Sequence, residues 1–344
     1  MFTFLKTRLH TAVMNAWYGE GNWTRYLSPF SAIFASLARW RKDHYQTKRC
    51  WKPPVPVIVV GNITVGGTGK TPVVTTLARY LAQQGYQPGV VSRGFGSRGA
   101  DYPVDVTALS SPGVVGDEPV MLATQCDCPV VVDPDRVRGA KHLCEVHQCT
   151  VIITDDGLQH YNLRRHIELV VVDGARMLGN GLCLPGGPLR EPAERLKSVD
   201  FVLINGDPVA DPGVHYTSFH LVPAPLEPVS GRVKQMNTRP QSCKVHAVAG
   251  IGNPQRFFKM LSALGFDVIP HPFPDHHWFT ESDITFSDSL PVIMTAKDAV
   301  KCQGFADTNH WYLPVITDIP SRELERIARR VQQVSMISDG QETV

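Results

Sequence analysis

The segment from residue 64 to residue 71 has the residue types of a phosphate-binding loop. It follows an apolar run, VPVIVVGN, and differs from the P-loop pattern G-x-x-x-x-G-K-[ST] only at its first position, where threonine replaces glycine. Glycines let backbone N–H groups turn toward phosphate oxygens, the lysine supplies a positive charge, and the last hydroxyl can ligate Mg²⁺. The sequence therefore predicts a nucleoside triphosphate site formed by Thr64, Val65, Gly66, Gly67, Thr68, Gly69, Lys70 and Thr71.

A second apolar run, VIITDDGLQH, ends in two adjacent acids, Asp155 and Asp156. They stand where a Walker B acid holds the Mg²⁺ of a bound nucleotide. A single acid at a strand end is often only a helix cap, but two in tandem in a P-loop chain favour metal binding. The sequence contains no N-K-x-D motif for guanine recognition, so ATP is the expected nucleotide.

The segment GDEP, at residues 116–119, supplies a carboxylate that can act as a base. An alcohol that attacks phosphorus loses its proton most readily to a side chain held close to its hydroxyl group. The same segment also fits a loop followed by a helix, because acidic side chains favour helix N-termini. The residues alone leave these two interpretations of Asp117 open.

Other polar side chains lie in segments that could border the nucleotide or its acceptor. Glu191, in PLREP, is a candidate Mg²⁺ ligand, and the alternative is an ion pair that closes this proline-rich loop. The remaining candidates for phosphate contacts or supporting positions are Arg93, Gln159, His160 and Arg190.

Short apolar strands must position these side chains. They are expected at residues 55–62, 88–94, 129–134, 150–156, 167–174 and 199–207, and they alternate with helical stretches such as TPVVTTLARYLAQQG. This alternation predicts an α/β fold of the P-loop NTPase type, with a doubly wound, mostly parallel sheet covered on both faces. Such sheets carry their chemistry in loops at the carboxyl ends of strands, where most of the candidate residues fall.

The chain is expected to have three parts. Residues 1–50 form an N-terminal helical segment, residues 51–225 the P-loop core, and residues 226–344 a smaller C-terminal α/β domain. A proline-rich connector is expected at 208–240, and the second α/β unit starts at VHAVAG, from residue 245. The sequence contains no secretory signal and no apolar run of about 18 residues, so no membrane-spanning helix is expected. The cysteines show no pairing or zinc-binding pattern, which favours reduced thiols in the cytosol.

The N-terminal segment has the composition of a surface that contacts an anionic partner. The net charge is only +2 over 344 residues, but residues 1–52 hold nine Lys and Arg against two acids, a net charge of +7. Within SPFSAIFASLARWRK an apolar stripe is expected on one helix face, formed by Phe30, Ile33, Phe34, Leu37 and Trp40. Such a helix lies in a membrane interface or docks on the main domain by the same stripe.

Taken together, these motifs resemble those of the tetraacyldisaccharide 4′-kinase family. The matching segments span residues 55–302 and are VPVIVVGNITVGGTGKTPVV, VVSRGFG, GDEPVMLA, VIITDDGLQHYNL, GNGLCLPGGPLREP, RLKSVD, AGIGNPQRFF, PDH and KDAVKC. Thr64 belongs to this resemblance, since the family's loop is similar to [TS]-x-G-G-x-G-K-T. One position departs from it: the family often has an acid where TAKD carries Ala296.

The resemblance implies transfer of the ATP γ-phosphoryl group, with Mg²⁺, to the 4′-hydroxyl of tetraacyldisaccharide 1-phosphate, which gives lipid IVA in lipid A biosynthesis. It implies that Asp117 is the catalytic base and that His276, matched by PDH, orients or tunes it across the two domains. It also implies a peripheral enzyme on the cytoplasmic face of the bacterial inner membrane. That enzyme would bind its lipid substrate and the membrane surface, with no nucleic acid and no obligate protein partner.

Two other activities also fit the motifs. A membrane-associated P-loop ATPase or switch would hydrolyse ATP without a sugar acceptor and would not need Asp117 or His276. A soluble small-molecule P-loop kinase would have no use for the N-terminal helix.

Overall fold

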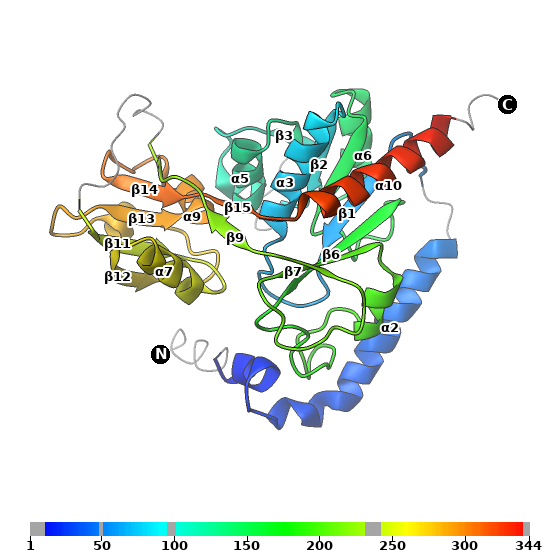
Figure 1. The fold of residues 1–344 in the computed structure, drawn as a ribbon, viewed down its shortest axis with the longest axis horizontal. Coiled ribbons are helices and arrows are strands. Elements are labelled where there is room, and N and C mark those ends of the chain that lie inside the picture. The colour runs from blue at the N-terminus through cyan, green and yellow to red at the C-terminus, as the bar shows by residue number, and fades with distance from the viewer. Residues whose placement is uncertain (1–10, 48–50, 95–100, 231–241, 340–344) are drawn as a thin grey trace.

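A large sheet of eight strands forms the main body of the computed structural model, which describes residues 11–47, 51–94, 101–230 and 242–339 (Figure 1). The strand order is β3-β4-β2-β5-β1-β6-β7-β8, and every neighbouring pair is parallel except β3 and β4. The strands are β1 (Val57–Gly61), β2 (Pro88–Ser92), β3 (Val104–Val106), β4 (Val130–Val132), β5 (Val151–Asp155), β6 (Ile167–Asp173), β7 (Phe201–Asn205) and β8 (Thr217–Phe219). The predicted doubly wound, mostly parallel α/β sheet is confirmed.

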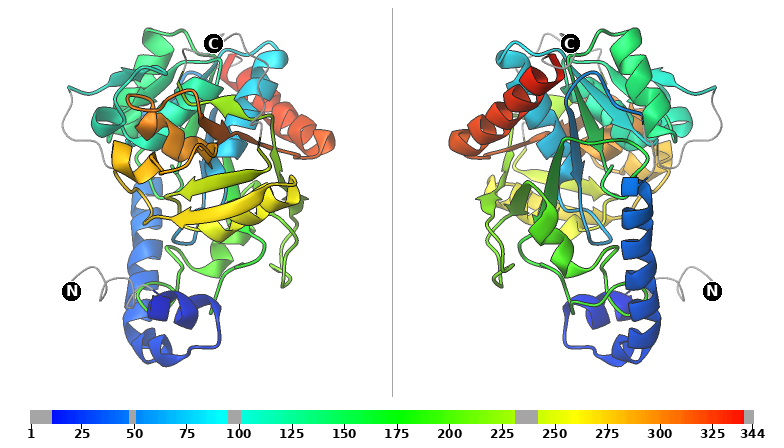
Figure 2. Two further views of the ribbon diagram at one scale, coloured as in Figure 1. Left: turned by 90° about the vertical axis from the view of Figure 1, so that its left-hand side faces the viewer. Right: turned by 90° about the vertical axis from the view of Figure 1, so that its right-hand side faces the viewer.

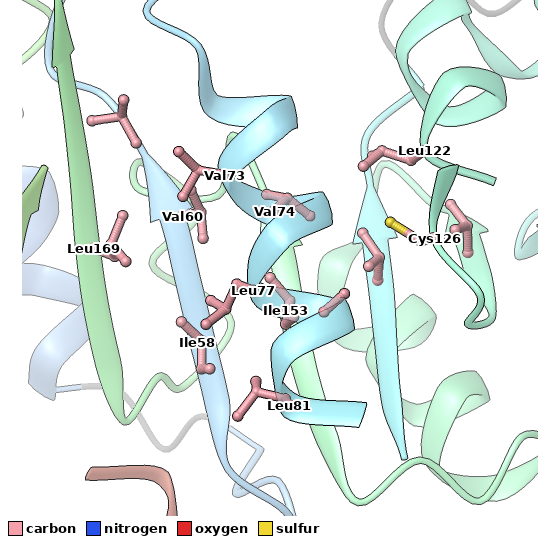
Figure 3. Packing of buried hydrophobic residues seen from close by; sticks show 14 of the residues in the cluster. Ile58, Val60, Val73, Val74, Leu77, Leu81, Leu122, Cys126, Ile153 and Leu169 are labelled. Atoms are coloured by element: carbon pink, nitrogen blue, oxygen red, sulfur yellow. The ribbon is translucent and has the colours of Figure 1, made fainter. Parts of the chain in front are cut away.

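Helices cover both faces of this sheet, which explains why strands such as β1 and β5 are buried at every residue. Side chains of α3 (Lys70–Gln83), α5 (Asp117–Gln125) and α10 (Ser321–Asp339) share one core with the sheet, and α6 (Arg136–Glu145) packs in a second core. In Figure 3, Leu77 and Leu81 of α3 lie against Ile58 of β1 and Ile153 of β5. The apolar spacing of α3 thus builds the layer that fixes the loop before it.

The register of β1 and β5 places the phosphate loop relative to the two adjacent acids. The two strands are parallel neighbours, and Val60 pairs with Asp155. The next strand along the chain, β6, lies on the other side of β1. Loops that leave the carboxyl ends of such central strands meet at one edge of the sheet. The loop after β1 and the acids after β5 are therefore adjacent.

A second, five-stranded sheet has the order β10-β14-β13-β11-β12, with only β10 antiparallel to its neighbour. Its elements are β10 (Glu227–Pro228), β11 (Lys244–Ala249), α7 (Pro254–Ala263), β12 (Asp267–Pro272), α8 (Glu281–Ile284), β13 (Val292–Thr295), α9 (Ala296–Cys302) and β14 (His310–Leu313). The smaller α/β unit predicted after the connector is therefore present. The expected connector itself contains short strands as well as loop, and its residues 231–240 lie outside the described residues.

The chain links the two sheets twice. Strands β9 (Leu221–Pro223) and β15 (Val315–Thr317) pair antiparallel between them, and α10 then returns to the core of the large sheet (Figure 1). Residues 226–344 were predicted to form one C-terminal domain, yet the last helix packs on the first core through its apolar stripe. The division of the chain into three parts stays a prediction.

The N-terminal part contains η1 (Trp23–Leu27) and the long helix α2 (Ser28–Thr47), which runs along the outside of the molecule (Figure 2). Phe34 packs on the second core, and Ser31 Oγ accepts the Gly186 N–H at 3.0 Å. No helix in the described part of the chain is long and apolar enough to cross a membrane. The remaining short elements are α4 (Pro112–Val115) and η2 (Ala193–Ser198).

Candidate active site

The phosphate loop connects β1 to α3 and uses glycine where the backbone requires it. Gly66 and Gly69 have φ angles of 103° and 93°, in a region that side chains disfavour. Two asparagines hold the loop: Asn62 Nδ2 donates to the Gly66 carbonyl at 3.2 Å, and Asn205 Nδ2 donates to the Thr68 carbonyl at 3.0 Å. Both asparagines lie at the carboxyl ends of sheet strands, so the sheet itself shapes the loop.

A second set of contacts comes from residues 176–189. The Val65 N–H donates to the Pro188 carbonyl at 2.9 Å, and Arg176 donates to the Gly67 carbonyl. Thr64 is buried and forms an antiparallel bridge with Leu189. An extended backbone of this kind does not need glycine, which gives a structural reason for the threonine in the first loop position.

Lys70 begins α3, and its Nζ lies 3.4 Å from Asp156 Oδ1. Arg190 contacts the other carboxylate oxygen of Asp156, with its Nη1 3.2 Å from Oδ2. Burial would raise the pKa of Asp156, but these two cations lower it below its usual value. Asp156 also has a φ of 50°, a left-handed conformation that aspartate tolerates better than most residues. The side chain thus joins the loop lysine to the PLREP segment.

Asp155, the last residue of β5, is 2% exposed, and its Oδ1 has no hydrogen-bond partner. Burial, followed by the charge of Glu118, raises the pKa of Asp155 to about 7, while Lys70 acts in the opposite direction. A buried carboxylate oxygen without a partner is costly, and a cation would relieve that cost. Asp155 and Asp156, with the Thr71 hydroxyl at the start of α3, offer the oxygen ligands that Mg²⁺ prefers. These residues fit the metal.

Asp117 lies at the N-terminus of α5, after Gly116, whose φ is 94°. Its Oδ2 is 3.2 Å from His276 Nδ1, and its Oδ1 accepts the Glu118 N–H at 2.9 Å. Burial would raise the pKa of Asp117, but the hydrogen bond from His276 and the nearby Lys297 lower it. The same hydrogen bond raises the pKa of His276. Asp117 is therefore an ionised carboxylate held in a fixed orientation.

Two lysines of α9 complete the surroundings of Asp117, and the sequence reasoning had given them no role. Lys297 Nζ lies 3.3 Å from both Glu118 Oε1 and Asp275 Oδ1, and 3.4 Å from His276 Nε2. Burial alone would lower the pKa of Lys297, but the charges of Glu118, Asp117 and Asp275 raise it above its usual value. The lysine therefore connects the GDEP segment to the PDH segment. Ala296, just before it, is buried against the first core.

Lys301 lies one turn further along α9. Its Nζ is 3.8 Å from Asp117 Oδ2 and 2.8 Å from Asp298 Oδ1. Asp298 is fully buried and also accepts hydrogen bonds from Thr295 Oγ1 and the Gly250 N–H. A signal for both lysines was present in the sequence: KDAVK, directly after a strand, places them at i and i+4 on one helix face.

Glu191 occupies a buried network. Its Oε1 accepts a hydrogen bond from Gln159 at 2.8 Å, and its Oε2 accepts from Tyr161 at 2.5 Å and from Arg195 at 3.1 Å. Gln159 also donates to the Asn62 carbonyl at 3.1 Å, directly before the phosphate loop. Both carboxylate oxygens of Glu191 therefore already bind protein donors, and the network supports the start of the loop.

Arginines gather around His160. Burial, then the charges of Arg136 and Arg93, lower its pKa to about 4, so the imidazole is neutral at pH 7. Arg93 is exposed at the end of β2. Arg136 is buried and donates to the carbonyls of Asp133 and Asp155, each at 3.0 Å. The sequence reasoning missed Arg136, because nothing in DPDRVRG marks the first residue of α6 as facing the next strand.

The predicted residues thus fall into two linked groups. Lys70, Asp155, Asp156 and Arg190 meet at the phosphate loop, while Asp117 and His276 meet between the two sheets. The charge of Glu118 acts on Asp155, and its carboxylate contacts Lys297. The two groups are therefore neighbours.

Comparisons with known proteins give one consistent family description for the chain. A family model described as tetraacyldisaccharide-1-P 4′-kinase matches residues 23–332 of the chain. The chain is 52% identical to the tetraacyldisaccharide 4′-kinase of Alkalilimnicola ehrlichii, over 84% of this chain and 87% of that protein. It is 43% identical to the protein of the same name from Nitrosococcus oceani, over 94% of this chain and 95% of that protein.

A solved structure is similar over nearly the whole chain. It is a crystal structure of LpxK from Aquifex aeolicus in complex with ATP, with a TM-score of 0.73 and 27% sequence identity. The similarity covers 90% of this chain and 99% of that one.

Proposed function

The chain belongs to the tetraacyldisaccharide-1-P 4′-kinase family and is an ATP-dependent kinase, and we propose that its reaction takes place between the phosphate loop and the Asp117–His276 pair. The reaction transfers the γ-phosphoryl group of ATP to the 4′-hydroxyl of tetraacyldisaccharide 1-phosphate, a step of lipid A biosynthesis. One observation carries the proposed location: the charge of Glu118, the neighbour of Asp117, acts on Asp155, the buried acid at the end of β5.

Asp117 accepts the proton of the 4′-hydroxyl in this proposal. Its carboxylate is ionised at neutral pH, and each oxygen keeps a lone pair beyond the one that accepts from His276 or from the Glu118 N–H. His276 is a positioning residue in this proposal, because it contacts the carboxylate through Nδ1. Lys297 and Lys301 keep this carboxylate ionised.

Lys70 and the N–H groups of residues 64–69 bind the phosphates of ATP. Lys70 forms a salt bridge with Asp156 in this structure. In the proposal, its ammonium group turns to the β- and γ-phosphates. Thr71, Asp155 and Asp156 would hold Mg²⁺, which when bound neutralises the charge on the phosphate oxygens. Phosphoryl transfer then depends mainly on how these groups place the reactants.

The remaining candidates support or extend this site. We infer that Glu191 orders the loop through Gln159 instead of ligating the metal, because protein donors already occupy both of its oxygens. Arg190 and Arg93 are candidates for phosphate contacts, since both side chains are at least partly exposed and Arg190 lies 3.2 Å from Asp156. His160, neutral and surrounded by arginines, contributes no charge.

Helix α2 brings the enzyme to its lipid substrate. Four apolar side chains of the predicted stripe point away from the protein, with exposed fractions of 61% for Phe30, 59% for Ile33, 58% for Leu37 and 63% for Trp40. Phe34 alone turns inward to the core. An apolar face of this kind beside basic residues suits a membrane interface. We place the enzyme peripherally on the cytoplasmic face of the inner membrane, with the lipid as its partner and no requirement for nucleic acid or another protein.

A direct assay tests the proposed function: purified full-length protein with Mg-ATP and tetraacyldisaccharide 1-phosphate in detergent micelles. The expected result is a product heavier by one phosphate, formed at the 4′ position. ATP hydrolysis at a rate that does not depend on the lipid would instead favour a P-loop ATPase or switch. Phosphorylation of a water-soluble sugar in preference to the lipid would favour a soluble kinase.

A further inference from the structure

Two histidines and an aspartate converge at the edge of the large sheet that β3 forms. His142 Nε2 lies 3.0 Å from Asp105 Oδ2, and His147 Nε2 lies 2.6 Å from Asp105 Oδ1. One possible ligand atom from each residue lies within 4.8 Å of the other two. The three residues come from β3, from α6 and from the turn after α6, so the fold brings them together over 37 and 42 positions of sequence.

We propose that Asp105, His142 and His147 bind a divalent transition-metal ion, with Zn²⁺ as the physiological candidate. Two imidazoles and one carboxylate form a common protein ligand set for Zn²⁺, and water takes the fourth position. The site does not depend on the kinase reaction, and none of its residues belongs to the phosphate loop or to the Asp117–His276 pair.

The separations of the ligand atoms fit an ion of this size. In a tetrahedral site with bonds of about 2.0–2.1 Å, neighbouring ligand atoms are about 3.3 Å apart. The contacts to Asp105, at 3.0 and 2.6 Å, are shorter than this by about 0.3 and 0.7 Å, so side-chain rotations that separate these atoms would admit the ion. Both histidines present Nε2, and Asp105 is half exposed, which leaves an open direction for entry and for a water ligand.

The alternation of β3 explains why Asp105 points to the histidines. Val106 is buried in the first core, beneath α5, and neighbouring strand residues point to opposite faces. Asp105 therefore faces the side that α6 covers. Since β3 has three residues and pairs with β4 alone, it is weakly held. A bound ion would fasten this edge strand to the C-terminal end of α6.

Another histidine cluster has the same residue types in a different arrangement and provides a control. His246 lies between its partners, with Nδ1 2.9 Å from His271 Nε2 and Nε2 2.9 Å from Asp288 Oδ1. Because opposite sides of one imidazole bind the two partners, the three ligand atoms cannot converge on one ion. In the other cluster, in contrast, both histidines contact the single carboxylate group of Asp105.

The test is a titration of tag-free full-length protein with Zn²⁺ by isothermal calorimetry, in an excess of Mg²⁺ that occupies oxygen-rich sites. Co²⁺ serves as a second probe, because its visible absorption reports imidazole ligation and low coordination number. The variants are His142→Gln, His147→Gln and Asp105→Asn, with His271→Gln as the matched control. Turnover with Mg-ATP in the absence of Zn²⁺ verifies that each variant is folded.

The proposal expects one Zn²⁺ per chain, and binding weakened at least about 10-fold in each of the three variants but not in His271→Gln. Zn²⁺ should also raise the thermal unfolding midpoint of the unmodified protein and of His271→Gln. It should not raise the midpoint of His142→Gln or His147→Gln. Failure of the unmodified protein to bind Zn²⁺ would overturn the proposal. A Zn²⁺ affinity in both His142→Gln and His147→Gln equal to that of the unmodified protein would overturn it too. These side chains would then form an ordinary hydrogen-bonded cluster.

Discussion

His276 Nδ1 lies 3.2 Å from Asp117 Oδ2, although 159 positions of sequence separate the two residues. Asp117 begins α5, which packs on the large sheet, and His276 lies in a turn that follows β12 of the smaller sheet. The backbone of His276 has a φ of 59°. The pair therefore forms only where the two sheets meet. A left-handed backbone at a non-glycine residue costs about 1–3 kcal/mol and is often kept for function. The position of His276 thus points to a role beyond packing.

The pair should give the enzyme a distinctive dependence of stability on pH. The hydrogen bond to Asp117 raises the pKa of His276 above 6.5, so its contribution is complete below pH 6.5 and is lost as the pH rises through the higher, folded value. The lowered pKa of Asp117 gives a contribution that is present above 3.8 and is lost as the pH falls through the folded value. Stabilisation by the pair is therefore greatest between these limits.

We expect His276→Gln to lower the thermal unfolding midpoint most near pH 5–6 and progressively less above pH 7. Unfolding followed by circular dichroism from pH 4 to pH 9 measures this, with the exposed His215→Gln as a control for the loss of any histidine. A midpoint difference that stays constant over that range, or grows with pH, would mean that the contact does not form in solution.

Lys70 should be required for nucleotide binding and for the reaction. Lys70→Ala removes the charge that faces the β- and γ-phosphates, and the loss of one such group commonly costs about 10²–10³ in turnover. Arg79→Ala is the control, because Arg79 is an exposed cation on the same helix. Calorimetric ATP affinity and steady-state turnover measure both effects. Unchanged values in Lys70→Ala would exclude residues 64–71 as the phosphate site.

Lys301 should matter for stability as well as for Asp117. It is 3% exposed and lies 2.8 Å from Asp298, which is fully buried. Because Lys301→Met leaves a buried carboxylate without its cation, we expect a loss of about 3 kcal/mol in the free energy of unfolding. Urea denaturation measures it, and the exposed Lys259→Met should change little. Adding Asp298→Asn to Lys301→Met should recover part of the loss.

Much of the fold could be predicted from the sequence, because parallel strands buried on both faces are continuous apolar runs. VIVVG and VIITD are examples, and the register between them places the phosphate loop beside Asp155 as expected for such a sheet. The return of α10 to the large sheet could not be predicted in this way. An apolar helix face shows that a helix packs, but the partner depends on where the chain leads, here through the β9–β15 pair.

The candidate site, too, could be predicted from the sequence only in part. The loop from Thr64 to Thr71 was evident because glycines, lysine and threonine have fixed tasks at fixed spacing. The engagement of Glu191 by Gln159, Tyr161 and Arg195 was not evident, since those donors come from separate loops that meet only in the folded chain. Side chains that act across long sequence separations carry little local signal.

The outward apolar face of α2 should determine membrane binding. Leu37→Glu places a charge on this face without disturbing a buried contact, because Leu37 is 58% exposed. Burying a leucine side chain contributes about 1.5–3 kcal/mol, so binding to anionic lipid vesicles should weaken at least about 10-fold. Leu109→Glu, at a leucine that is 93% exposed, is the matched control. Vesicle co-sedimentation measures the difference, and equal binding of both variants would argue that α2 does not contact the membrane.

The role of Asp117 as the base is tested most directly by Asp117→Ala, assayed with Mg-ATP and tetraacyldisaccharide 1-phosphate in micelles. Asp127→Ala, an exposed aspartate beyond the end of α5, serves as the control. Turnover by Asp117→Ala should fall by about 10²–10⁴, the usual contribution of a positioned base, while the Kd for ATP stays within about threefold of the unmodified enzyme. Turnover that is retained, together with a weakened ATP affinity, would contradict the account and make Asp117 a binding group.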